Sequence, residues 1–101
     1  MTKTVKVIDP LLAHYTLAQG VKWVVETHGL ILTDGKGKVW LLHYPEAAIW
    51  DLLMREYPMD KVFSMMTYIA SINSEEARNL VLNALNNWTQ EGLMVKEVRH
   101  G

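Results

Sequence analysis

The sequence predicts one α+β domain that is winged-helix-like: a three-stranded antiparallel β-meander followed by three α-helices. Hydrophobic residues alternate with period two between about residues 20 and 43, which is typical of half-buried strands. After Tyr44 the spacing of hydrophobic residues changes to the helical repeat. The chain has 101 residues, of which half are hydrophobic, so it is long enough for one domain with its own core.

The β-meander is expected between Gly20 and His43. In its first strand Val21, Trp23 and Val25 alternate with Lys22 and Glu26. The second strand is expected over 30–33 and the third over 39–42. A glycine-rich turn at 34–37 joins them, because glycine takes a positive φ at little cost.

Three helices are expected in the second half of the chain. The first starts near Pro45 and stops before Pro58. Asp60 is expected to cap the second helix and Ser74 the third, because their side-chain oxygens can accept hydrogen bonds from a first helical turn. Gly92 suits the left-handed residue that ends a helix, and a last short strand is expected over 93–98.

The two ends of the chain differ from the domain, which is expected to cover 20–98. Residues 1–19 lack a clean period and contain Asp9-Pro10, so we expect an N-terminal arm there, and 99–101 form a tail. Asp9-Pro10 also interrupts the start before the apolar core of a signal peptide could form. No apolar run approaches the roughly 18 residues of a membrane span. With no cysteine, the chain is expected to be cytoplasmic.

The chain contains four tryptophans, which is many for its length. Trp50 and Trp88 fall on the apolar stripes of the expected first and third helices, so we expect them in the core. Trp23 lies on the apolar face of the first strand. Trp40 is expected to line either the core or a binding groove.

A more specific motif spans the end of the third strand and the start of the first helix. This stretch, 39–53, resembles the PqqD-like family. The residues in register with that family's pattern are Leu42, Ala47, Ile49, Trp50, Leu52 and Leu53. The resemblance covers about 20–95. His43 stands where the family usually has Asn and Glu46 where it usually has Gly, so Tyr44 and Pro45 must shape the start of the first helix.

The resemblance implies a RiPP recognition element, a non-catalytic adaptor or peptide chaperone without a cofactor. Such domains bind the leader of a ribosomally made precursor peptide as an added strand. They present it to a separately encoded modifying enzyme, often a radical S-adenosylmethionine enzyme. The precursor, the product and any involvement of pyrroloquinoline quinone, and hence of cofactor biosynthesis, stay open. The docking strand that the resemblance implies is Lys38, Val39, Trp40, Leu41, Leu42 and His43.

An unpaired strand edge favours the same geometry, because its N–H and C=O groups can bind an extended peptide. A face of the third helix would form the opposite wall, with Leu80 exposed; its residues are Glu76, Leu80, Asn83 and Asn87. Helical periodicity alone favours ordinary solvated residues there. About five main-chain bonds contribute roughly 1 kcal/mol each, whereas micromolar affinity needs about 8 kcal/mol. Apolar peptide side chains must therefore be buried as well.

A winged-helix DNA-binding transcriptional regulator is the alternative, because its elements follow a similar order. Charge argues against it. The third helix carries Arg78 against Glu75, Glu76 and Glu91, and an acidic helix is repelled by phosphates. Nucleic acid is therefore not the expected partner.

An enzyme is not expected either. The sequence contains no nucleophile elbow, no His-Glu-x-x-His and no phosphate loop. His28 and His43 are expected to be near neighbours across the sheet, but a metal site usually needs three or four ligands. No catalytic or metal-binding residue is assigned. A homodimer through the exposed strand edge is left open.

Overall fold

The computed structural model describes residues 6–9 and 13–98. In chain order these residues form β1 (Lys6–Asp9), β2 (Ala13–Leu17), β3 (Lys22–Glu26), β4 (Gly29–Thr33), β5 (Val39–Leu42), α1 (Glu46–Met54), α2 (Met59–Ala70), α3 (Ser74–Gln90) and β6 (Met94–Val98). The predicted α+β fold, a three-stranded antiparallel meander followed by three helices, is confirmed. Of the helices described, none is long and apolar enough to cross a membrane.

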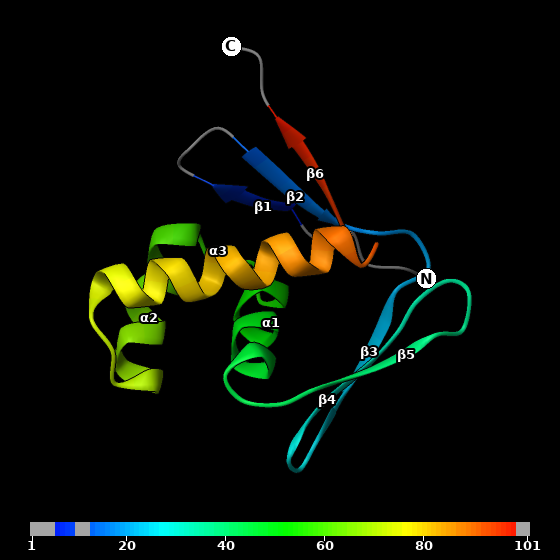
Figure 1. Ribbon diagram of the computed structural model, residues 1–101, viewed down its shortest axis with the longest axis horizontal. Coiled ribbons are helices and arrows are strands. Elements are labelled where there is room, and N and C mark those ends of the chain that lie inside the picture. Colours follow the sequence, from blue (N-terminus) through cyan, green and yellow to red (C-terminus); the bar gives the residue numbers. More distant parts are fainter. Residues whose placement is uncertain (1–5, 10–12, 99–101) are drawn as a thin grey trace.

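The meander has the strand order β3-β4-β5. Its register places Trp23 opposite Leu32 and Leu32 opposite Trp40. The expected turn joins β4 to β5: Gly37 has a φ of 88°, and the Asp34 side chain accepts hydrogen bonds from the N–H groups two and four residues later. Figure 1 shows the meander extending to one side of the helices.

A second antiparallel sheet has the order β1-β2-β6 and lies on the other side of α3 in the view of Figure 1. The expected strand over 93–98 is confirmed as β6, but β1 and β2 are not predicted from the sequence. They fall in the expected arm, where short strands on either side of 10–12 give no sustained period. Tyr15 and Leu17 of β2 are buried in the core. The tail at 99–101 lies outside the described residues.

The core is centred on tryptophan. Trp50 is fully buried, and Trp88 is 3% exposed, which confirms both as core residues. Trp50 meets Trp23 at 6.2 Å and Trp88 at 5.0 Å between ring centroids, both edge-on. Edge-on pairs of this kind add about 0.5–1.5 kcal/mol beyond the area they bury. Trp23 and Trp40 are half-buried and pack against the same core.

The start of α3 differs from its expected form. Asn73 is the N-cap, in extended backbone, and its side-chain oxygen accepts a hydrogen bond from the Glu76 N–H at 2.8 Å. Ser74, the expected cap, is the first helical residue. Both residues suit an N-cap, and sequence alone does not tell which of two neighbours takes the extended conformation. At the other end Gly92 has a φ of 79°, as expected for the residue that ends the helix.

The boundaries of α1 and α2 also differ in detail. α2 begins at Met59 directly after Pro58 and has no side-chain cap, so Asp60 lies within its first turn. α1 ends at Met54, and Glu56 then takes a positive φ of 64°, so the helix stops before the proline is reached. These shifts leave the order of the elements unchanged.

The cap on α3 gives a test of the fold. Asn73→Ala removes the side-chain oxygen that accepts a hydrogen bond from the Glu76 N–H, so the free energy of unfolding should fall by about 1 kcal/mol. Ser74→Ala is the matched control and should change it by less than about 0.5 kcal/mol. Urea denaturation followed by circular dichroism measures both. Equal losses in the two variants would contradict the assignment of the cap.

Candidate functional site

β5 is an edge strand of the meander. Its backbone pairs with β4 in a register that runs from Thr33 opposite Val39 to Leu30 opposite Leu42. Within residues 6–9 and 13–98, no strand pairs with its other flank. A flank of this kind presents main-chain donors and acceptors to any extended chain that lies beside it.

The main chain of Val39 and Leu41 points toward this open flank. The hairpin fixes the phase, because the Asp34 N–H donates to the Lys38 carbonyl oxygen at 3.0 Å. In an antiparallel ladder, hydrogen-bonded pairs alternate with pairs whose groups point outward. Asp34 and Lys38 form a hydrogen-bonded pair, so the pairs of Val39 with Thr33 and of Leu41 with Ile31 are not hydrogen-bonded to each other. Val39 and Leu41 turn both N–H and C=O toward the flank, whereas Trp40 bonds to β4.

The side chains of β5 alternate between two faces. Trp40 and Leu42 face inward, where they are half-buried against the core. The side chains of Val39 and Leu41 lie on the opposite, solvent-facing side of the sheet (its outer face) and are 61% and 57% exposed. The Lys38 ammonium lies 4.9 Å from the centre of the Trp40 ring, a cation–π contact. A strand added to β5 would thus meet an aromatic, half-buried side and an aliphatic, solvent-facing side.

The far end of β5 is tied to the helices. The His43 carbonyl oxygen accepts a hydrogen bond from the Ala47 N–H at 2.8 Å, which starts α1. The Tyr44 hydroxyl donates to the Ile69 carbonyl oxygen of α2 at 2.9 Å. No side chain caps α1, and Pro45 occupies the N-cap position. Tyr44 and Pro45 therefore shape this junction, as the sequence predicts.

An open hollow of about 280 Å³ lies on the outer face beside the end of β5. Gly29 is one of its lining residues, and a Cβ added there would collide with the Leu42 carbonyl oxygen, so this position has room for glycine alone. His28 and His43 are both lining residues, in line with their expected proximity. The described residues contain no group of three or more potential metal ligands. The lining residues are Glu26, Thr27, His28, Gly29, Leu41 and His43.

The predicted face of α3 is mostly exposed. Glu76, Asn83 and Asn87 are exposed, but Leu80 is half-buried and packs against the core. The expectation of an exposed Leu80 is therefore wrong, because its position one turn from the core stripe brings it partly under cover. α3 packs most closely against α2 and β6. That its exposed face forms one groove with β5 stays a prediction.

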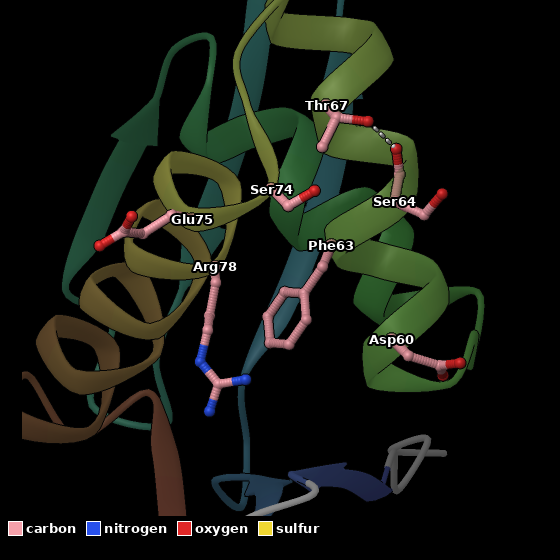
Figure 2. Close-up of a pocket in the computed structure, with 7 residues that line it drawn as sticks. All are labelled: Asp60, Phe63, Ser64, Thr67, Ser74, Glu75 and Arg78. Atoms are coloured by element: carbon pink, nitrogen blue, oxygen red, sulfur yellow. Dashed lines mark hydrogen bonds between the residues drawn. The ribbon is translucent and has the colours of Figure 1, made fainter.

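A second depression, of about 460 Å³, lies between α2 and α3 and is not predicted from the sequence. Figure 2 shows Arg78 of α3 beside Phe63 of α2. The guanidinium carbon lies 5.6 Å from the centre of the Phe63 ring. Arg78 is the only basic residue of α3, and Glu75 lines the same depression. The charged side chains of α3 are therefore Arg78 and the two acidic residues of its first turn, Glu75 and Glu76.

One solved structure has a similar fold. It is described as lasso peptide synthetase B1 complexed with the leader peptide, and it matches with a TM-score of 0.72 at 18% sequence identity. The match covers 80% of this chain and 96% of that chain. At this identity the likeness concerns the fold alone. No protein-family model matches the sequence, and no curated protein matches it.

Amide hydrogen exchange tests the phase of β5. In the free chain, the N–H groups of Trp40 and Leu42 should exchange slowly because they bond to β4. Those of Val39 and Leu41 should exchange quickly because they face the open flank. Two-dimensional NMR after transfer to D₂O measures each amide. Slow exchange at Val39 and Leu41 in a monomeric sample would show that the flank is already covered.

Proposed function

We propose that this chain is a non-catalytic peptide-binding adaptor. It binds the leader segment of a ribosomally made precursor peptide by β-strand addition and presents that peptide to a separately encoded modifying enzyme. The observation that carries the proposal is the open flank of β5, where Val39 and Leu41 direct main-chain donors and acceptors outward. The resemblance of 39–53 to the PqqD-like family and the fold shared with a protein solved with a leader peptide support it.

The flank offers a limited amount of binding energy. The open groups are the N–H and C=O of Val39 and Leu41 and the N–H of His43, whose carbonyl is already bonded to α1. About five hydrogen bonds contribute roughly 1 kcal/mol each, and ordering a flexible peptide costs roughly 2–5 kcal/mol. Micromolar affinity needs about 8 kcal/mol. Two or three apolar peptide side chains, at roughly 1.5–3 kcal/mol each, make up the difference.

The proposed site combines 38–43 with the face of α3 that contains Glu76, Leu80, Asn83 and Asn87. Leu80 and Trp40 are half-buried, so each retains apolar surface that a peptide side chain can cover.

The domain at 20–98 would carry this site. No side chain is assigned a catalytic role, and the chemistry belongs to the partner enzyme, for which a radical S-adenosylmethionine enzyme is one candidate.

The DNA-binding alternative has weaker support. Arg78 packs on Phe63, and the first turn of α3 carries Glu75 and Glu76. Duplex affinity depends largely on neutralised phosphates and therefore on exposed cations. A duplex titration at low salt should give no salt-dependent binding.

Proline scanning of the two sheet edges tests the proposal. Leu41→Pro removes an outward N–H of β5 and no bond to β4, and edge strands accept proline at such positions. It should weaken binding of the leader peptide of a neighbouring precursor about tenfold or more. Val25→Pro is the matched control, because the same alternation turns the Val25 N–H outward on β3, the opposite edge. It should leave the affinity within about twofold.

The measurement is a titration of the ¹⁵N-labelled full chain with that peptide, followed by NMR, with thermal unfolding to show that both variants are folded. Shifts at 38–43 that are lost in Leu41→Pro and kept in Val25→Pro support the proposal. Unchanged signals at 38–43 in the parent chain, or equal weakening in both variants, would refute binding at β5.

A further inference from the structure

The outer face of the meander carries an apolar stripe that the core does not use. The register places Val24 opposite Ile31 and Ile31 opposite Leu41, so one line of aliphatic side chains crosses all three strands. Val24 is 58% exposed and Leu41 57%, and Val39 beside them is 61% exposed. Solvent-facing positions of a sheet usually carry polar residues, so a continuous apolar line needs a physical reason.

The stripe ends at the open flank of β5. Val39 and Leu41 contribute outward main-chain groups to the flank, and their side chains belong to the outer face. In an antiparallel ladder, a residue paired with Leu41 stands on the same face with its Cβ about 4.5–5.5 Å away. The outward residues of an added strand would therefore lengthen the stripe by one more position. Apolar side chains there would lose water on both sides of the new strand boundary.

The hollow over Gly29 lies next to the same end of the stripe. Its lining residues combine Leu41, whose side chain is aliphatic, with His28, His43 and Glu26, whose side chains are polar. A mixed wall of this kind suits a side chain with an apolar ring and a polar tip. Tyrosine and tryptophan have this form and bury about 150–250 Å² each.

We propose that the outer face of the meander reads the sequence of the bound peptide. The peptide segment on β5 is an extended strand with apolar side chains at every second position. Among the peptide residues whose side chains lie on the outer face, the one nearest His43 is an aromatic residue with a polar tip. Its side chain lies against Leu41 and over Gly29. This inference rests on the proposed function and adds the class of peptide that the edge accepts.

Selection from a randomised peptide library displayed on phage, with the immobilised full chain as bait, tests the inference. The selected peptides should share apolar residues at every second position, with tyrosine or tryptophan enriched at one of them. For a synthesised peptide of this pattern, Leu41→Ser should weaken binding about tenfold. Val24→Ser is the matched control, because Val24 lies two strands away from the edge, and it should change the affinity by less than about twofold.

Peptides that shift the NMR signals of 38–43 but lack the alternation would overturn this inference and leave the proposed function standing. So would an affinity that is unaffected by Leu41→Ser. Failure to recover any peptide that shifts 38–43 would overturn both. A chain that forms a dimer in sedimentation, and that both serine variants make monomeric, would assign the stripe to a contact between copies instead.

Discussion

The edge-on contacts of Trp50 with Trp23 and Trp88 join the meander to the helices, and the rest of the fold depends on this junction. Trp50 comes from α1, Trp23 from β3 and Trp88 from α3, so one fully buried indole joins the meander to two helices. Its Nε1 has no hydrogen-bond partner among the described residues. The ring is therefore positioned by van der Waals contact with the two indoles beside it. The inner face of the meander is thereby committed to the core.

This arrangement explains why β5 can remain an open edge. The tryptophan anchor of the meander lies on β3, at the opposite edge, and β5 adds only the half-buried side chains of Trp40 and Leu42. β5 is fixed by its ladder with β4, by the Asp34 turn and by the His43 carbonyl that starts α1. The strand is therefore held in register without using its outer flank, which leaves that flank ordered in the free chain. An ordered edge lowers the entropy that binding must overcome.

The sequence predicts the parts of the fold whose periodic signal is strong. Val21, Trp23 and Val25 lie at every second position beside the charged Lys22 and Glu26, and the turn glycines mark the hairpin. The meander could therefore be placed to within a residue. β1 and β2 are short and are separated by residues near Pro10, which leaves no sustained period. Asn73 and Ser74 are equivalent as caps in the sequence, and only the backbone separates them. Tertiary packing, rather than local pattern, decided these cases.

The candidate site divides in the same way. The edge at 38–43 follows from the order of strands in a meander, which sequence can supply. The half-burial of Leu80, the contact of Arg78 with Phe63 and the hollow over Gly29 depend on how elements pack, and no local pattern contains them. The apolar line from Val24 to Leu41 lies between these cases: its residues are visible in the sequence, but it requires the exact register of the two hairpins.

An isotope-filtered NOE experiment on the labelled full chain with an unlabelled leader peptide tests the open edge most directly. Strand addition predicts cross-strand contacts between the main chain of the peptide and Val39 and Leu41. Contacts confined to the depression beside Phe63 and Arg78, with β5 unchanged, would contradict it.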